Sequence, residues 1–178
     1  MKRDFRIDAR GLELEDAMSA WAVIEPIWML PAGSDHDARL PAPWRDVTAG
    51  QLRVYAVTWV EREVINGGFW QYLYNTSADL PLQALEGFQT MGSTDYAGLL
   101  KRALSVFPGG VLPPTRGNRM RCLPEDPYEE EPEQQRALLN TLDELNSKFY
   151  ELYGDGAGFY GQIANYVRGH PEEFFVGL

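Results

Sequence analysis

A pair of adjacent glycines interrupts an apolar segment that shows helical periodicity on both sides. Gly67 and Gly68 follow a stripe of apolar residues that predicts a helix over about residues 49–65, and a second short helix is predicted over about 69–75. Asn66 or Gly67 is expected to take the left-handed conformation that ends the first helix. The pattern therefore predicts two helices joined at an angle.

Polar side chains surround this joint, among aromatic residues that are expected to be buried. Buried amides need hydrogen-bond partners. One interpretation is a polar and aromatic pocket for a small ligand or a reaction. The other is a hydrogen-bonded lock that fixes the angle between the helices, which we favour because amides commonly satisfy helix ends. The residues of the joint are Glu63, Asn66, Gly67, Gly68, Phe69, Gln71, Tyr72 and Asn75.

Helical patterns recur along the rest of the chain, and no convincing alternation predicts a strand. A capping box at Thr48 and Gln51 begins the helix before the joint. A second capping box at Thr141 leaves open whether the segment after Pro132 forms one helix or two. Loops are expected over 31–47 and 108–131, and helices over about 13–29, 80–91, 94–107, 132–153 and 159–169.

These elements predict an all-α fold, a single-domain bundle of about six to eight helices with a long N-terminal loop. Residues 1–47 are expected to form an extension made of a helix and a loop, and residues 48–175 the helical domain. No segment has the roughly 20 uninterrupted apolar residues that a membrane span needs. The single Cys122 excludes an internal disulfide, so we expect a cytoplasmic protein.

The chain is acidic, and its charge is unevenly distributed. The net charge is −10, from 26 acidic and 16 basic residues. Residues 123–178 contain 12 of the acidic residues and 3 of the basic ones. Such a chain repels nucleic acid and anionic membranes and favours basic partners. Direct binding of nucleic acid or a membrane is therefore not expected.

No motif for catalysis, metal binding or cofactor binding is recognisable. His36 and His170 lie near loop or helix-end residues, without a nucleophile motif nearby, and Ser105 and Cys122 have no evident partner base. Zinc-ligand spacing and a phosphate-binding glycine loop are both missing from the sequence. We therefore expect a protein that is not an enzyme and that needs no cofactor or metal.

A short basic segment precedes the acidic end of the chain. Arg116, Arg119 and Arg121 lie within six residues of one another in the sequence. They have the chemistry to hold a phosphate or a carboxylate ligand. In so acidic a chain, however, we favour pairing with the protein's own acidic residues.

The joint is also the centre of a family resemblance. The stretch from Glu63 to Asn75 reads Glu-Val-Ile-Asn-Gly-Gly-Phe-Trp-Gln-Tyr-Leu-Tyr-Asn. It resembles the Asn-Gly-Gly-Phe-x-Gln signature of a bacterial family of small helical proteins, a domain of unknown function named after its DNA-mimic member. Later matches occur in the same order, and the resemblance covers residues 48–175. They are Ala84-Leu85-Glu86, Leu99 to Leu104, Phe107 to Gly110, Lys148-Phe149-Tyr150 and Tyr166 to Phe174.

The resemblance implies an all-α fold, no established catalysis, no cofactor and an acidic surface that imitates the phosphate backbone of DNA. The expected partner is a basic protein, in the sharpest form a DNA-binding protein, and a homodimer is also considered. The carboxylates that would contact the partner, here called the acidic face, are Glu125, Asp126, Glu129, Glu130, Glu131, Glu133, Asp143, Glu144 and Glu151.

Two alternatives to this interaction module stay open. One is a small-ligand-binding protein or an unrecognised enzyme with its pocket at residues 63–75. The other is an immunity or stress-accessory protein, which the sequence does not separate from the interaction module.

Overall fold

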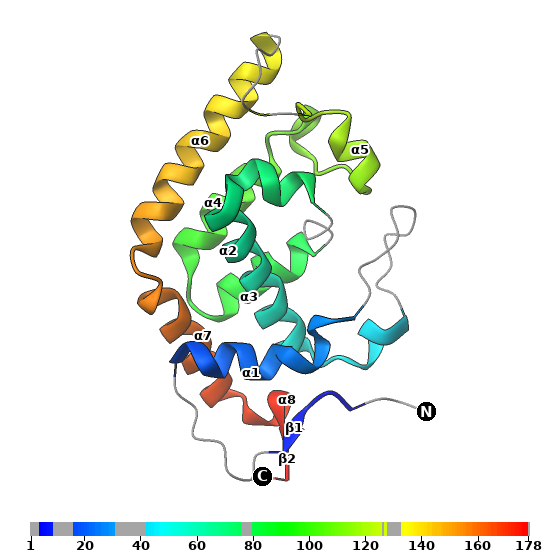
Figure 1. Cartoon of the computed structure of the whole chain (residues 1–178), viewed down its shortest axis with the longest axis vertical. Coiled ribbons are helices and arrows are strands. Elements are labelled where there is room, and N and C mark those ends of the chain that lie inside the picture. Colours follow the sequence, from blue (N-terminus) through cyan, green and yellow to red (C-terminus); the bar gives the residue numbers. More distant parts are fainter. Residues whose placement is uncertain are drawn as a thin grey trace.

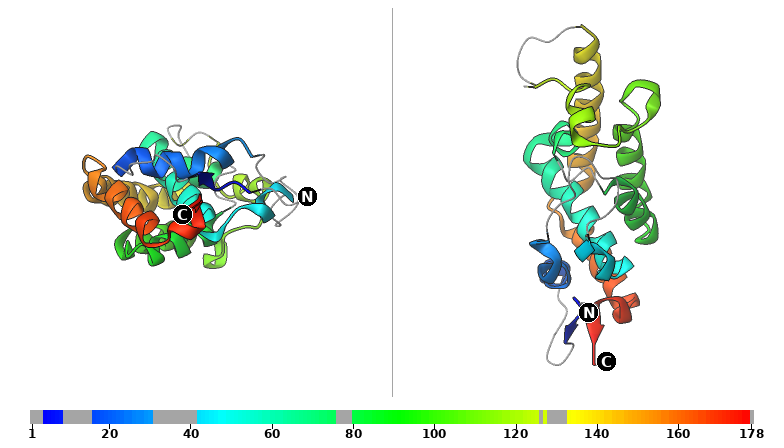
Figure 2. Two further views of the ribbon diagram at one scale, coloured as in Figure 1. Left: turned by 90° about the horizontal axis from the view of Figure 1, so that it is seen from below. Right: turned by 90° about the vertical axis from the view of Figure 1, so that its right-hand side faces the viewer.

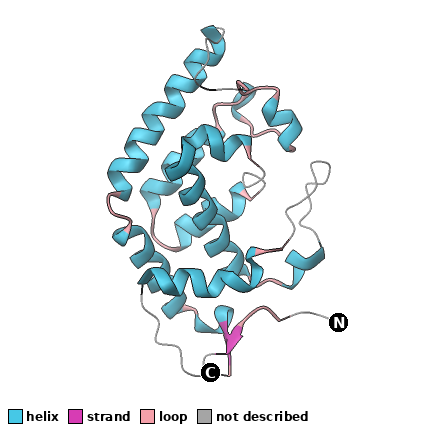
Figure 3. Ribbon diagram, viewed as in Figure 1, coloured by secondary structure: helices cyan, strands magenta, loops and turns pink. Residues whose placement is uncertain are grey.

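The computed structural model describes residues 4–8, 16–30, 42–75, 80–125, 127 and 133–177. Helices make up most of these residues (Figure 3), and the predicted all-α fold is confirmed. The molecule is elongated, with α2 at its centre and α6 along one edge (Figure 1). The elements in chain order are β1 (Ile7–Asp8), α1 (Asp16–Trp28), η1 (Ala42–Asp46), α2 (Ala49–Tyr74), α3 (Pro81–Thr90), α4 (Thr94–Leu104), η3 (Pro108–Gly110), α5 (Arg116–Met120), α6 (Glu133–Tyr153), α7 (Ala157–Gly169), α8 (Pro171–Phe174) and β2 (Phe175–Val176).

The central helix α2 begins at the predicted capping box. Thr48 Oγ1 accepts a hydrogen bond from the Gln51 backbone N–H at 3.1 Å, and Gln51 Oε1 accepts one from the Thr48 N–H at 3.4 Å. These bonds satisfy donors that a helix start leaves without intrahelical partners. Beyond this turn, α2 contacts α1, α3, α5, α6 and α8. Contact on several sides explains why its apolar residues are not confined to one narrow stripe.

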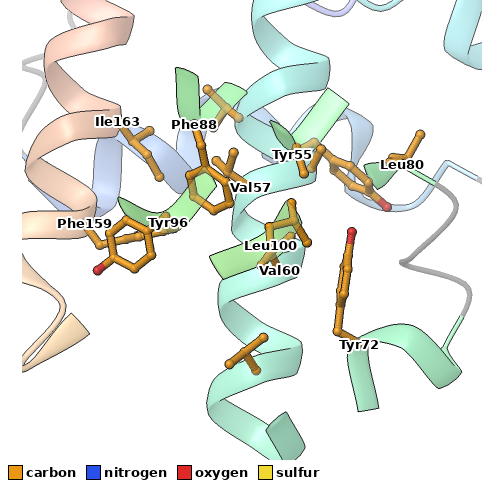
Figure 4. Packing of buried hydrophobic residues seen from close by; sticks show 14 of the residues in the cluster. Tyr55, Val57, Val60, Tyr72, Leu80, Phe88, Tyr96, Leu100, Phe159 and Ile163 are labelled. Atoms are coloured by element: carbon orange, nitrogen blue, oxygen red, sulfur yellow. The ribbon is translucent and has the colours of Figure 1, made fainter. Parts of the chain in front are cut away.

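Buried side chains of α2, α3, α4 and α7 belong to one hydrophobic core. Figure 4 shows Val57 and Val60 of α2, Phe88 of α3, Leu100 of α4 and Phe159 of α7, none of them more than 3% exposed. The rings of Phe88 and Phe159 meet edge to face, with centroids 6.2 Å apart. Burying a side chain of this size contributes about 1.5–3 kcal/mol. This cluster fixes the four helices relative to one another.

Helix α6 has a buried and an exposed side. Leu142, Leu145 and Phe149 recur at intervals of three and four residues and are at most 1% exposed. This spacing places them on one face of a helix, and that face packs against α2 and α4. The opposite side of α6 faces solvent along the edge of the molecule (Figure 1).

The two ends of the described chain meet beside the start of α2. Strands β1 and β2 pair in parallel, with Ile7 opposite Phe175 (Figure 2). Thr48 Oγ1 donates a hydrogen bond to the Glu173 backbone carbonyl at 2.7 Å, and the Gly50 N–H donates one to the Glu173 carboxylate. The C-terminal segment thus supplements the capping of α2.

Short elements account for several differences from the predicted fold. Helices η3 and α5 lie within the predicted loop 108–131, and η1 lies within the predicted loop 31–47, whose residues 31–41 are outside the described part. Helix α8 and the two-residue strands were also not predicted. Elements this short show no full period of apolar residues, and tertiary contacts determine them instead.

The structure resolves the alternative that the sequence left open after Pro132, and it shortens the helix predicted over 94–107. Helix α6 is continuous from Glu133 to Tyr153, and Thr141 donates its hydroxyl to the Ala137 carbonyl at 3.0 Å inside the helix instead of capping a second one. Ser93 occupies the position before α4 without capping it, because its hydroxyl donates to Gln162 of α7. Helix α4 ends at Leu104 instead of continuing to residue 107.

Candidate functional site

The double-glycine joint is a kink inside α2. Gly68 has φ 73° and ψ −178°, a combination that is open almost only to glycine, while Gly67 has an extended φ of −157°. The left-handed residue is therefore Gly68, and the prediction of Asn66 or Gly67 was wrong. The reason lies in α6, because a Cβ on Gly68 would stand 2.9 Å from Cγ of Asn146. The joint needs glycine for its backbone angles and for this close approach.

Asn146 fixes the joint from outside α2. Its Oδ1 accepts a hydrogen bond of 2.7 Å from the Phe69 N–H, the first helical donor after the kink. The Phe69 ring is completely buried and meets Phe149 of α6 edge to face at 5.8 Å. One amide and one aromatic ring thus join the second half of α2 to α6.

The joint is closed on its other side by a carboxylate. Glu63 Oε2 accepts hydrogen bonds from Gln71 Nε2 at 2.6 Å and from Asn75 Nδ2 at 2.8 Å. Glu63 lies before the kink and is 7% exposed, whereas Gln71 and Asn75 lie after it. A single buried carboxylate therefore bridges the two halves of α2. Hydrogen bonds to a charged group are stronger than neutral ones.

The end of α2 is capped by two of the three clustered arginines. Arg119 is 1% exposed, and it donates to the carbonyls of Leu73 at 2.9 Å and Asn75 at 3.1 Å. Arg116 donates to the carbonyl of Tyr74 at 2.9 Å, with its guanidinium 5.4 Å from the Tyr74 ring centroid. These carbonyls have no partner within the helix, and the negative end of the helix dipole favours cations. Arg121 is exposed and does not take part in this cap.

Only three residues of the joint line a common hollow, and the aromatic residues of the joint do not. A surface hollow of ≈ 580 Å³ contains Glu63, Asn66 and Gln71 of the predicted joint. Phe69 and Tyr72 are completely buried in the core instead. The other residues of the hollow are Trp59, Glu61, Arg62, Ile65 and Tyr160.

The acidic face is described only in part. Glu125, Glu133, Asp143, Glu144 and Glu151 are all exposed, and the last four lie on α6. The Asp143 carboxylate accepts a bond of 3.3 Å from Asn146 Nδ2. The remaining members, Asp126, Glu129, Glu130 and Glu131, lie outside the described residues.

Three of these carboxylates share one side of α6. Glu133, Glu144 and Glu151 are separated by eleven and seven residues, close to whole numbers of turns at 3.6 residues per turn. We call them the α6 row. Because their helix packs through its opposite side, the row faces solvent along the long edge seen in Figure 1. Arg136 and Lys148 lie on the same helix, which limits its negative charge.

A comparison with models of protein families shows to which family the chain belongs. The model of the family described as DMP19-like protein matches residues 45–170. This chain belongs to the DMP19-like protein family. Comparison with curated proteins gave no match, and comparison with solved structures gave none either.

The DMP19-like match includes the whole of α2 with its kink, and it ends just before α8. It confirms the predicted relationship at the level of the family, while the role of the Asn-Gly-Gly-Phe-x-Gln signature stays a prediction. The acidic face also lies inside the matched residues. Helix α1, which packs on α7 and α2, lies outside them.

Sequence reasoning missed one buried carboxylate of this DMP19-like chain. Glu61 is 5% exposed, and its Oε1 accepts a hydrogen bond of 2.8 Å from the Tyr153 hydroxyl. Burial raises the pKa of Glu61, against the opposing effects of Tyr153, Tyr160 and Arg62. The signal was available, because Glu61 occupies a core position between Val57 and Val64 at helical spacing.

The described part of the DMP19-like chain contains neither a membrane-spanning helix nor a cluster of metal-ligating side chains. None of its helices combines the length and the apolar character needed to cross a membrane. No group of three or more His, Cys, Asp or Glu side chains within the same residues is arranged to hold a metal ion.

Proposed function

We propose that this DMP19-like chain binds a basic protein through its acidic face, and that the partner is a DNA-binding protein whose DNA site the chain occupies. The observation that carries the proposal is the α6 row, with exposed carboxylates on one side of a single straight element. The net charge of −10 supports it, because a negative field attracts basic partners over distance. The proposed role requires no catalysis.

The row is held rigidly, which favours binding. The buried residues Leu142, Leu145 and Phe149 fix the rotation of α6 about its axis. Tyr150 adds a hydrogen bond of 2.9 Å from its hydroxyl to the carbonyl of Val64 in α2. A partner therefore meets carboxylates whose backbone positions are already set, and ordering costs are reduced.

Charge density limits the part that α6 can play alone. At 1.5 Å per residue, the α6 row spans about 27 Å. Duplex DNA carries one charge per ~1.7 Å, or about 16 over this length. Helix α6 carries Glu133, Asp143, Glu144 and Glu151 against Arg136 and Lys148. The row can therefore match the positions of only a few phosphates, and the proposal adds the other carboxylates of the acidic face, Glu125, Asp126 and residues 129–131.

The test is competition with DNA. Labelled duplex DNA is bound to each of a panel of purified DNA-binding proteins, and the chain is added while fluorescence anisotropy is followed. Release of the DNA, with an affinity that falls as salt rises, is the expected result. Binding that does not displace DNA would leave an interaction module without mimicry. Binding that is insensitive to salt would contradict the electrostatic proposal altogether.

A matched pair of triple variants locates the surface. Glu133→Gln, Glu144→Gln and Glu151→Gln together remove the α6 row. We expect the complex to weaken about tenfold or more, because each exposed pair contributes up to about 1 kcal/mol. The control removes three exposed carboxylates elsewhere, Glu25→Gln, Asp95→Asn and Glu172→Gln. Equal weakening by both triples would show that total charge matters and that the α6 row does not.

A further inference from the structure

A hollow of ≈ 710 Å³ lies between the end of α4, the segment after α5 and the first turns of α6. None of its lining residues belongs to the α6 row or to the kink of α2. Its walls combine two arginines with polar and apolar side chains. The residues around it are Arg102, Ser105, Val106, Pro108, Arg121, Cys122, Gln135, Ala137, Leu138 and Thr141.

Neither arginine of the hollow forms an ion pair with an acidic side chain in the described part of the chain. Arg121 is exposed, and its one described polar contact is a donation of 3.4 Å to Asn118 Oδ1. Arg102, in the last turn of α4, is exposed and pairs with no acidic side chain in the part of the chain that the structure describes. Arg116 and Arg119, by contrast, are bonded to the end of α2. In these contacts the two arginines donate to backbone carbonyls, whereas the favoured prediction was pairing with the chain's own acidic side chains.

Two guanidinium groups that pair with no acidic side chain among the described residues point to an anion. Guanidinium donors match carboxylate and phosphate oxygens in planar, paired hydrogen bonds. Most of the surface of a chain with net charge −10 repels anions. Anion binding at this place would therefore depend on local contacts and not on the overall field.

The rest of the wall indicates what the anion carries. Val106, Pro108 and Leu138 offer apolar surface beside the arginines, and Thr141 and Gln135 offer polar groups. Ligand sites commonly combine apolar walls with a few polar groups that orient the ligand. We propose that this hollow binds a small organic anion, with its carboxylate or phosphate on Arg102 and Arg121 and its apolar body on the side of Leu138.

A cysteine in the wall of the hollow can report whether a ligand is bound. Cys122, the one cysteine of the sequence, is half-buried in its wall, and its thiol donates to the Asn118 carbonyl at 3.6 Å. A ligand in the hollow would cover the sulfur. Alkylation of Cys122 by iodoacetamide, an uncharged reagent, can therefore be followed by mass spectrometry with and without anions.

The probes are phenyl phosphate, benzoate and inorganic phosphate, with sodium chloride added to keep the ionic strength equal. Phenyl phosphate and benzoate are expected to slow the alkylation in a saturable way. Inorganic phosphate, which lacks the apolar body, is expected to bind more weakly. Protection by sodium chloride alone, or none by any organic anion, would overturn the proposal.

Three variants localise the effect. Arg102→Gln and Arg121→Gln are each expected to raise the phenyl phosphate concentration for half protection about tenfold or more, as for loss of a hydrogen bond to a charged group. Lys101→Gln removes the same charge from the neighbouring position of α4, outside the hollow, and is expected to change it less than about twofold. Equal effects of all three would overturn the site. Circular dichroism checks that each variant is folded.

Discussion

The kink of α2 and the outer side of α6 use carboxylates in opposite ways. Glu63 is buried, and it accepts two hydrogen bonds from residues beyond the kink. Glu144 and Glu151 are exposed on a helix that packs through its other side. The first carboxylate accepts its bonds from within the protein, and the other two accept no side-chain hydrogen bond from the described residues. The comparison teaches that the segment carrying the family resemblance and the proposed binding surface are different parts of this molecule.

The largest effect is expected at Gly68. In Gly68→Ala the side chain would meet Asn146 and would require a backbone conformation that is unfavourable for any other residue, at a cost of about 2–4 kcal/mol. Urea denaturation measures the loss. Gly98→Ala, at an exposed position of α4 where nothing stands near the added carbon, is the control and is expected to stabilise by up to about 1 kcal/mol. Similar results for both would contradict the assignment of the kink to Gly68.

A smaller loss is expected when the bridging carboxylate is removed. Glu63→Ala leaves the amides of Gln71 and Asn75 without their acceptor, which costs about 1–3 kcal/mol. The control Glu25→Ala, exposed on α1, is expected to stay within about 0.5 kcal/mol of the parent. Both free energies of unfolding are measured by urea denaturation. A free energy of unfolding unchanged by Glu63→Ala would show that the bridge does not stabilise the kink.

Glu61 allows the effect of a buried carboxylate on stability to be tested as a function of pH. Its raised pKa means that the folded chain binds this proton more tightly than the unfolded chain does. The charged form therefore lowers stability above the folded pKa, and this loss disappears as the pH falls toward the unfolded value of about 4.3. Glu61→Gln keeps an oxygen for the Tyr153 hydroxyl. We expect the variant to be more stable than the parent near neutral pH and to match it near about pH 4.

Thermal unfolding across that pH range measures the difference between the two proteins. A stability gain of Glu61→Gln that grows as the pH falls would have the wrong sign and would contradict the raised pKa.

The smallest effect on stability is expected on the α6 row. Glu144→Gln is predicted to change the free energy of unfolding by less than about 0.5 kcal/mol, because the side chain is exposed. The same change is expected to weaken binding to a basic partner, which titration calorimetry at low salt would detect. A large loss of stability in Glu144→Gln would instead show that this carboxylate stabilises the fold, as Glu63 at the kink of α2 is expected to do.

The sequence predicted the elements that depend on neighbouring residues. The capping box at Thr48, the interruption at the glycines and the continuous stripe of Leu142, Leu145 and Phe149 are all visible within a few turns of the chain. The helical period and the cap chemistry are local, so they can be predicted without knowledge of the tertiary structure.

The features that were missed depend on residues far apart in the chain. Gly68 takes the left-handed conformation, and it lies against Asn146 of α6. Arg119 caps α2 because the fold brings it to the carbonyls of Leu73 and Asn75. The hollow with Arg102 and Arg121 likewise joins two segments that have no pattern in common. Such contacts are set by tertiary packing, which a single sequence does not display.

The pairing of β1 with β2 has a consequence for the order of folding. Ile7 and Phe175 come from nearly opposite ends of the chain, so a very large loop must close before they meet. With two paired residues per strand, the pairing offsets little of the entropy that is lost when this loop closes. We therefore expect the pair to form after the helices have assembled and to open before they separate. Amide hydrogens there are expected to exchange with solvent faster than those at the centre of α2, reporting a local opening of the native chain.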